Sequence, residues 1–285
     1  MPKATAATVE IAGITLTHPD RVLWPDQGVS KCALAEYYAD IADRILSHVA
    51  NRPLTLVRCP SGNDGACFVQ KHSSAGLHKA VRRVRDGDDE WLAVDDMSGL
   101  AALVQACVLE LHPWGATTDD LERPDRIVFD LDPNEGVPWA HVVEGARAIH
   151  AALKDLGLRG FVKATGGKGL HVMVPIEPHA DWETVKAFAR DVAARLAAAR
   201  PERYTTNPLK EARSGRIFQD HLRNSRGATA VAAYSTRARP GAPVAMPLAW
   251  ETLGDAAAAP RYGMADLPAG DPWKGFFEVR QRLPG

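Results

Sequence analysis

The sequence lacks several features that assign many proteins to a class at sight. Its 285 residues contain no signal peptide and no apolar run long enough to span a bilayer. The formal net charge is only -1, so a polyanionic partner would have to meet a local basic patch rather than the field of the whole molecule. We therefore expect a cytoplasmic globular protein without a membrane partner, and the overall charge decides nothing about its ligands.

Cysteine is scarce, and its spacing is uninformative. The chain has four cysteines and no C-x-x-C pair, namely Cys32, Cys59, Cys67 and Cys107. This usage predicts free thiols in a reducing compartment. A zinc site made of two of these cysteines with His72 and His78 is conceivable, but the spacing matches no standard zinc pattern, so we expect ordinary side chains there.

The first part of the chain mixes helical and strand patterns. Apolar residues at helical spacing predict one amphipathic helix between Ser30, the expected N-cap, and Pro53. The segment LTLVRCP is typical of a strand, and MSGLAALVQA of a buried helical turn or two. In the predicted strand CVLELHPW, Val108, Glu110 and His112 share one face.

The second part of the chain has a regular order of elements. A strand RIVFDLDP precedes a helix that ends at Gly157, and a strand, a glycine turn and a strand follow. A second helix has Asp181 as its expected N-cap, and the third strand is expected over 217–222, before a basic loop. This order predicts a small sheet with helices on one face. The tail after Gly254 is expected to be loosely structured and docked by aromatic residues, Trp273, Phe276 and Phe277.

Three acidic residues are candidates for a metal site. Asp130 and Asp132 lie two apart in a predicted strand, so both carboxylates project to one face, and Asp220 lies in an apolar row of another strand. Such oxygen ligands suit Mg²⁺ or Mn²⁺. A surface turn is the alternative for this motif, and a glycosyltransferase remains open. A haloacid-dehalogenase phosphatase is disfavoured, because Asn134 stands where that class has a small or branched residue.

Two further segments suit a phosphorylated ligand. The turn KATGGKGLH presents backbone N–H groups together with Thr165, Lys168 and His171, although it lacks the spacing of a Walker loop. A simple hairpin with a satisfied histidine is the alternative. Arginines follow Asp220 at high density and could clamp a triphosphate or a nucleic-acid backbone, or could form a solvated face. They are Arg223, Arg226, Arg237 and Arg239.

Several segments, taken together and in order, resemble one known family. They are GVSKCALAEYY, LELHPWG, FDLDP, TGGKGLHVMVP, DHLRN and ATAVAAYSTRAR. They are similar to the polymerase domain of bacterial ligase D, a branch of the archaeo-eukaryotic primase superfamily that works in non-homologous end joining. The likeness runs from about Leu16 to about Trp250.

The resemblance implies a role for each candidate residue of the nucleotide site. Asp130, Asp132 and Asp220 fall where the family holds two metal ions, with Mn²⁺ preferred to Mg²⁺. His171 falls where the family meets the triphosphate of the incoming nucleotide. The other positions matched to that pocket are Thr165, where the family usually has Ser, Lys168 in the same turn, Arg223, Arg237 and His112.

The resemblance also implies DNA contacts near the start of the chain. Arg21 and Lys31 match basic positions that grip the 5′-phosphate at the far side of a gap, and Arg21 stands where a lysine is common. Phe68 lies near the aromatic residue that stacks on template bases. The implied partner is thus gapped or broken duplex DNA with a 5′-phosphate.

The implied activity is template-directed addition of nucleotides to primer 3′ ends by a two-metal mechanism, with NTPs preferred to dNTPs. The K-x-D-G motif of a ligase is missing, so a ligase and an end-binding protein are expected in trans or within a longer parent chain, at the bacterial nucleoid. A non-catalytic DNA-end binding module and a D-x-D glycosyltransferase are the alternatives.

The expected fold class is α/β (α+β), with the archaeo-eukaryotic primase fold. We expect residues 1–285 to form a single polymerase domain of the ligase D type. Within it, residues 1–115 would form an N-terminal mixed α/β module, residues 116–250 an RRM-like catalytic lobe, and residues 251–285 a C-terminal tail.

Overall fold

The structure is a computed structural model that describes residues 7–73, 76–254 and 258–284. The chain divides into two compact units. Unit 1 consists of residues 1–113, 231–244 and 263–265, and unit 2 of residues 114–230, 245–262 and 266–285. The chain therefore leaves unit 1 after Pro113 and returns to it twice.

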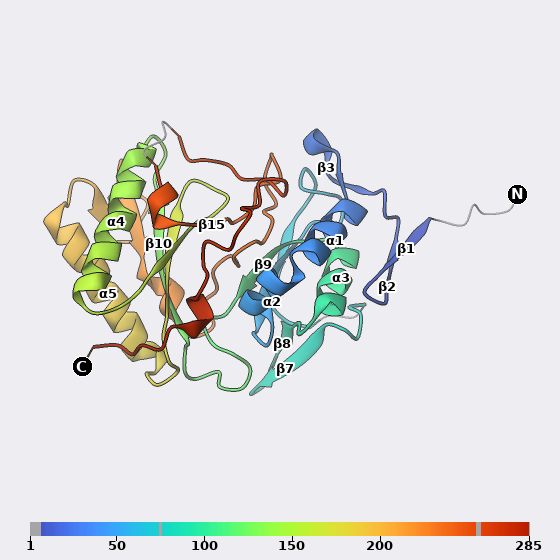
Figure 1. Cartoon of the computed structure of the whole chain (residues 1–285), viewed down its shortest axis with the longest axis horizontal. Helices are drawn as coiled ribbons and strands as arrows, with labels where there is room; N and C mark the ends of the chain where they lie inside the picture. Colours follow the sequence, from blue (N-terminus) through green and yellow to red (C-terminus); the bar gives the residue numbers. More distant parts are fainter. Residues whose placement is uncertain (1–6, 74–75, 255–257, 285) are drawn as a thin grey trace, which may run out of the picture. The chain divides into compact units, whose positions relative to one another are not determined.

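Unit 1 combines helices with short, mainly antiparallel strands (Figure 1). Its helices are α1 (Lys31–Asp40), α2 (Ala42–Val49) and α3 (Met97–Gln105). Its main sheet has the order β6 (Phe68–Gln70), β5 (Leu54–Arg58), β8 (Asp89–Ala93) and β7 (Arg82–Asp86), with β9 (Val108–Pro113) also paired to β5. Two small hairpins join β1 (Thr8–Ile11) to β2 (Ile14–Thr17) and β3 (Val22–Trp24) to β4 (Val29–Ser30).

The helical segment after Ser30 differs from the expected single helix. The Ser30 hydroxyl accepts a hydrogen bond from the Ala33 N–H at 3.1 Å, which confirms the predicted N-cap. The backbone then leaves helical geometry at Ile41 (φ -112°, ψ 17°), and a second helix begins at Ala42. The Ile41 side chain is buried, so the apolar spacing continues through the break and conceals it.

The expectation of four free thiols was wrong for one pair. Cys59 and Cys67 form a disulfide across the loop between β5 and β6, with their Cα atoms 4.3 Å apart. The antiparallel register pairs Arg58 with Phe68, which brings the two adjoining cysteines together. Cys32 and Cys107 are free. The pairing depends on strand register, and the cysteine spacing alone does not reveal it.

Unit 2 is built on a sheet of six strands. In order they are β13 (Tyr204–Thr205), β14 (Ile217–Asp220), β10 (Arg126–Pro133), β12 (Leu170–Pro175), β11 (Phe161–Ala164) and β15 (Pro247–Leu248). Helices α4 (Trp139–Asp155) and α5 (Trp182–Ala199) follow β10 and β12 in the chain. The central four strands and both helices thus follow the order β-α-β-β-α-β, which confirms the predicted RRM-like lobe.

The two faces of this sheet differ in what covers them. Apolar residues of β10 and β12 that alternate along each strand, such as Leu131 and Val172, point toward the helices, which lie side by side in Figure 1. The sheet therefore has helices on one face, as predicted. The C-terminal tail covers part of the other face, where Trp273 and Phe276 are buried against Phe161. The indole N–H of Trp273 donates to the Val162 carbonyl at 2.8 Å, and this contact fixes the tail.

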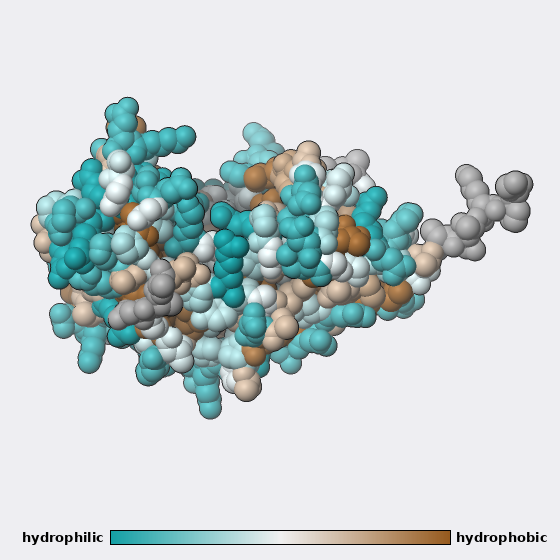
Figure 2. All heavy atoms as spheres, turned by 90° about the horizontal axis from the view of Figure 1, so that it is seen from above, coloured by the Kyte–Doolittle hydropathy of each residue, from teal (hydrophilic) through white to brown (hydrophobic). Residues whose placement is uncertain are grey.

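The face drawn in Figure 2 is largely hydrophilic, and hydrophobic residues appear there in small separate patches. Among the described residues, the exposed large apolar side chains are Val9, Val22, Phe68, Val69, Leu209, Leu222 and Phe277. Of these, only Phe68 and Val69 are consecutive, and both lie on β6. No helix in the described part of the chain is long and apolar enough to cross a membrane.

Candidate functional site

A polar row crosses the sheet of unit 2 on the face opposite the helices. Antiparallel register pairs Lys163 of β11 with His171 of β12, His171 with Asp130 of β10, and Asp130 with Asp220 of β14. Directly opposed residues project to the same face, so these four side chains lie in line. Asp132 is on the same face, two residues beyond Asp130. The structure therefore brings together the residues that the sequence nominated, and it adds Lys163, which is buried.

Two arginines hold the carboxylates of this row. The Arg223 Nε atom lies 3.1 Å from an Asp130 oxygen and 3.2 Å from an Asp220 oxygen, so one guanidinium bridges both acids. Arg213 forms an ion pair with Asp132 and lies over the ring of Phe218. The sequence pattern gave no reason to select Arg213, because it lies in a short 3-10 turn (Glu211–Arg213) outside the strands.

Burial and neighbouring charges set the protonation of the row. Burial acts to raise the pKa of Asp130, but His171 and Arg223 outweigh it and hold that pKa well below its usual range. Burial lowers the pKa of His171 to about 4, against the opposing effect of Asp130. We conclude that at neutral pH Asp130 is ionised and His171 is neutral. The His171 Nε2 atom then donates toward Asp130 over 3.3 Å.

Asp220 and Arg223 complete this charge balance. Burial raises the pKa of Asp220, and Asp130 adds to that effect while Arg223 opposes it. The two carboxylates together raise the pKa of Arg223 against the effect of its burial. The charged guanidinium of Arg223 thus reduces the repulsion between two acids that lie side by side.

The carboxylates of the row suit a hard divalent cation. As arranged, no three Asp, Glu, His or Cys side chains within the described ranges converge closely enough to form a metal site. The oxygen donors of Asp130, Asp132 and Asp220 are nevertheless the kind that Mg²⁺ and Mn²⁺ prefer. A guanidinium already bridges two of them, so a cation would compete with Arg223 for the same oxygens.

The glycine turn between β11 and β12 is closed by Thr165. Its hydroxyl donates to the Gly169 carbonyl at 3.0 Å and accepts from the Gly167 N–H at 3.3 Å. A Cβ at Gly169 would lie 2.3 Å from the Leu131 carbonyl oxygen, so only glycine fits there. Lys168 is exposed at the tip of the turn. The hydroxyl that the sequence nominated for a ligand therefore also stabilises the turn itself.

Asn224 fixes the segment that follows Asp220. The strand predicted over 217–222 ends at Asp220, and a 3-10 helix, η3 (His221–Asn224), begins there. The Asn224 side chain accepts from the Val128 N–H and donates to the Val128 carbonyl, both at 2.8 Å. It thus replaces the strand pairing that β10 loses where β14 ends. The DHLRN motif contains this residue, although sequence analysis gave it no role.

Unit 1 holds the two other residues nominated for the nucleotide pocket, and a third residue joins them. Glu110 Oε2 accepts from Arg237 Nε at 2.9 Å and lies 2.7 Å from His112 Nε2. His112 and Arg237 belong to β9 and to the returning segment 231–244, respectively. Burial acts to raise the pKa of Glu110, but His112 and Arg237 outweigh it and lower the pKa to about 2. Sequence analysis placed Glu110 on the same strand face as His112 but did not select it.

The residues nominated for DNA contacts also lie in unit 1. Arg21 is exposed and donates to the Pro60 carbonyl at 3.0 Å. Lys31 is buried, and its ammonium donates to the Thr17 carbonyl at 2.9 Å. Burial lowers the pKa of Lys31. Phe68 is 46% exposed and lies under the Arg58 guanidinium, at 5.4 Å from ring centroid to carbon, so its ring is accessible for stacking.

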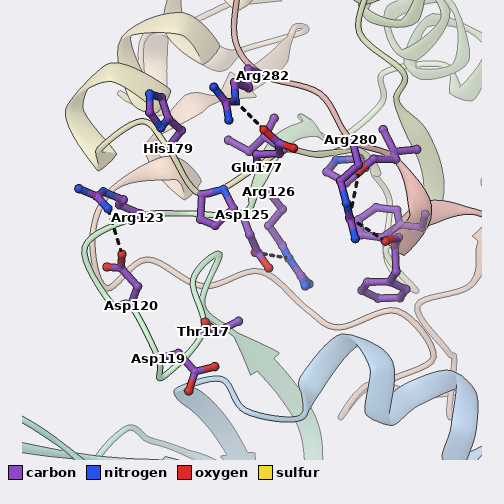
Figure 3. A pocket seen from close by; sticks show the side chains of 16 residues that line it. Thr117, Asp119, Asp120, Arg123, Asp125, Arg126, Glu177, His179, Arg280 and Arg282 are labelled. Carbon is purple, nitrogen blue, oxygen red and sulfur yellow. Dashed lines mark hydrogen bonds and ion pairs between the residues drawn. The ribbon is translucent and has the colours of Figure 1, made fainter.

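Unit 2 also has a pocket of about 600 Å³ at the other end of β10 (Figure 3). Arg126 and Asp125 lie in it, four or more residues before Asp130 along the chain. Its wall includes several acids and arginines that pair with one another, such as Arg282 with Glu177 at 2.5 Å. The pocket is therefore separate from the polar row.

Comparison with known proteins gives a consistent result. Residues 30–273 match the family model described as LigD, primase-polymerase domain. The multifunctional non-homologous end joining protein LigD of Pseudomonas aeruginosa is 40% identical over 291 residues, which cover 98% of this chain and 35% of that protein. The corresponding DNA repair protein LigD of Mycobacterium tuberculosis is 36% identical over 256 residues, which cover 86% of this chain and 34% of that protein.

A solved structure agrees with these relatives. The polymerase domain from Mycobacterium tuberculosis ligase D, in complex with DNA, superposes with a TM-score of 0.86 at 32% sequence identity. The match covers 95% of this chain and 99% of that one. The chain spans about a third of the length of the curated relatives that it matches.

Proposed function

Because this chain belongs to the LigD primase-polymerase family, whose polymerase domains are metal-dependent nucleotidyltransferases, we propose that it extends primer 3′ ends at gaps and broken DNA ends in bacterial non-homologous end joining. The observation that supports this most is the polar row of unit 2. It aligns Asp130, Asp220 and His171 across adjacent strands, with Arg223 bridging the two acids. A polymerase needs buried carboxylates of this kind beside groups that can meet a triphosphate.

We assign the metal to the three carboxylates. Asp130, Asp132 and Asp220 would hold one or two Mn²⁺ or Mg²⁺ ions, which lower the pKa of the primer hydroxyl and neutralise phosphate charge. Arg223, which pairs with Asp130 and Asp220 in this structure, would be free to meet the phosphates of the nucleotide if these carboxylates held a cation. The same carboxylates would thus pair with arginine in the free protein and bind a metal ion in the active complex.

The remaining residues of the nucleotide pocket act on the incoming NTP or dNTP. His171 would donate from Nε2 to the triphosphate. The turn held by Thr165 would offer backbone N–H groups, and Lys168 a mobile cation. His112 and Arg237 of unit 1 are also assigned to nucleotide binding. We also propose that ribonucleotides are preferred, through a contact to the 2′-OH.

The DNA contacts are assigned to unit 1. Arg21 and Lys31 would meet the 5′-phosphate at the far side of a gap, and Phe68 would stack on a template base. Because the relatives are much longer proteins, ligation and end binding would come from other parts of such a protein or from partners in trans. This activity would place the protein with the chromosome in the bacterial cytoplasm.

The test is single-nucleotide extension on a gapped duplex, with Mn²⁺ and with NTPs compared to dNTPs, with and without a 5′-phosphate. Asp130→Asn removes one negative charge at constant size, and we expect it to lower kcat by about three orders of magnitude or more without loss of DNA binding. Asp120→Asn is the matched control, because Asp120 is paired with Arg123 in a loop outside the row.

Each outcome has a clear meaning. Template-directed addition that needs Asp130 and rises with the 5′-phosphate would support both the chemistry and the end-joining role. A wild-type protein that binds the gapped duplex but adds no nucleotide with either metal would contradict the proposal. That result would leave a DNA-end binding module as the better account.

A further inference from the structure

Glu110 holds together a cluster outside the polar row, and although it lies within the segment LELHPWG, no role has been given to it so far. The residue is 6% exposed in the middle of β9. Its Oε2 atom lies 2.7 Å from His112 Nε2 and 2.9 Å from Arg237 Nε, and its Oε1 atom accepts from the Ala238 N–H at 2.8 Å. One buried carboxylate of β9 therefore contacts His112 on the same strand and, in the returning segment, the Arg237 side chain and the Ala238 backbone.

The segment that bears Arg237 is otherwise held through its backbone and small hydroxyls. The Ser235 hydroxyl accepts from the Leu111 N–H at 2.9 Å, and the Thr236 hydroxyl donates to the Leu109 carbonyl at 2.7 Å. These bonds place the main chain of the segment beside β9, but they leave the direction of a long guanidinium side chain open. Glu110 directs the Arg237 side chain, because its carboxylate accepts a hydrogen bond from the guanidinium Nε at 2.9 Å.

The chemistry of the contacts fixes the orientation of both partners. A carboxylate can only accept, so the His112 Nε2 atom must carry its proton toward Glu110, which sets the ring and its tautomer. The Nε atom of arginine is at the base of the planar guanidinium, so a bond there fixes the plane in which the terminal nitrogens lie. The side chains of Arg237 and His112 are 11% and 18% exposed, against 8% for Glu110, so the carboxylate lies beneath the groups that it orients.

We propose that Glu110 is a positioning residue that presents His112 and Arg237 to the incoming nucleotide. This inference rests on the proposed function, because that function assigns both partners to the nucleotide. Glu110 itself would not touch the nucleotide. Its two bonds from Oε2 would keep the imidazole and the guanidinium in the binding geometry before the nucleotide arrives, so that no ordering of either side chain is required on binding.

The experiment compares Glu110→Gln, Arg237→Ala and the double variant in the gapped-duplex assay. We expect Glu110→Gln to raise the KM for the NTP about tenfold and to change kcat by less than about threefold. In the Arg237→Ala background the same change should raise KM by no more than about twofold, because the main group that Glu110 orients is already gone. A merely structural role would give equal factors in both backgrounds.

Direct binding makes the result independent of turnover. Calorimetric titration with Mn²⁺ and ATP should show the same loss of affinity in Glu110→Gln, while the affinity for gapped duplex stays within about twofold. Glu110→Asp keeps the charge but shortens the side chain, so its KM for the NTP should lie between those of the wild type and Glu110→Gln. This variant replaces Glu110→Gln in the assay if the glutamine variant does not fold. Asp95→Asn is the control, because it breaks the Arg82–Asp95 pair (2.7 and 2.9 Å) in the same unit and should leave KM unchanged.

The outcomes separate this inference from the function on which it rests. If the wild type binds or uses NTPs and Glu110→Gln behaves like it, the positioning role is wrong and the proposed function stands. If Glu110→Gln raises KM equally in both backgrounds, Glu110 is only structural. If the wild type neither binds nor incorporates NTPs, both proposals fail together.

Discussion

The polar row of unit 2 and the Glu110 cluster of unit 1 both bury carboxylates, but they neutralise them differently. Asp130 and Asp220 share one guanidinium whose own side chain is 43% exposed, and Asp132 is 50% exposed beside Arg213. Glu110 is enclosed by Arg237, by His112 and by a backbone N–H. The side chains of Glu110, Arg237 and His112 are each less than 20% exposed. The arginines that pair with the row can therefore move from the carboxylates into solvent more easily than the enclosed partners of Glu110 can.

This difference suits the polar row to exchange of its cation and the Glu110 cluster to retention of its partners. A carboxylate pair held by a half-exposed arginine can give its oxygens to a metal, because the released guanidinium is solvated again at little cost. A carboxylate enclosed by several donors would leave buried partners unsatisfied if it lost them, which is costly. The polar row is therefore suited to binding a cation, and the Glu110 cluster is suited to holding His112 and Arg237 in fixed orientations.

The largest expected effect is the pH dependence of the stability that ionised Glu110 gives to the folded protein. The folded-state pKa of Glu110 is about 2 against an ordinary 4.5, so its ionised form stabilises the protein above the ordinary value, and this contribution is lost as pH falls toward 2. It amounts to about 3 kcal/mol at neutral pH.

The measurement is urea unfolding of the wild type and of Glu110→Gln at pH 7 and pH 3. The difference in unfolding free energy between the two proteins should narrow by about 2 kcal/mol at the lower pH. A difference of the same size at both pH values would show that Glu110 has no stabilising interaction that depends on its charge.

An effect of similar size tests the part of unit 2 that holds the polar row in place. Asn224→Ala leaves the buried N–H and carbonyl of Val128 without their side-chain partner, and we expect a loss of about 2–3 kcal/mol of unfolding free energy. Asn207→Ala is the control, since Asn207 accepts from Leu209 in an exposed turn and should cost under about 1 kcal/mol. Equal losses in the two variants would contradict the role given to Asn224.

The smallest expected effect tests whether arginine and metal compete in the row. Arg213→Ala frees Asp132 from a partly exposed ion pair worth about 0.5–1 kcal/mol, so Mn²⁺ should bind about two- to fivefold more tightly. Arg216→Ala, three residues on, removes a cation that donates to the Pro201 carbonyl at 3.3 Å, and it should change the Mn²⁺ affinity less. A weaker affinity in Arg213→Ala would show that Arg213 supports the metal instead of competing with it.

The local parts of the fold and site could be predicted from the sequence. Strand alternation alone put Asp130 and Asp132 on one face, and the spacing of apolar residues and caps indicated α4, α5 and the β11–β12 hairpin. These features depend on residues close together in the chain. The register that places His171 and Asp220 opposite Asp130 is set by packing of the whole sheet, so residue patterns did not reveal it.

Other features depend on contacts that are distant in sequence. Glu110 was visible on the face of β9, but its partner Arg237 is 127 residues further on, so its role could not be read from the strand. Arg213 belongs to a turn with no periodic pattern. The break at Ile41 was missed because the buried Ile41 side chain continues the apolar spacing of the helix. The disulfide between Cys59 and Cys67 was missed because the strand register brings the two cysteines together.

The most direct test of the account is whether the polar row binds a divalent cation at all. Electron paramagnetic resonance follows free Mn²⁺ as protein is added, for the wild type and for Asp130→Asn, Asp220→Asn and the control Asp120→Asn. We predict saturable loss of the free Mn²⁺ signal with the wild type and the control, and an affinity about tenfold weaker or worse in the two row variants. Equal Mn²⁺ binding by all four proteins would contradict the assignment of the metal to this row.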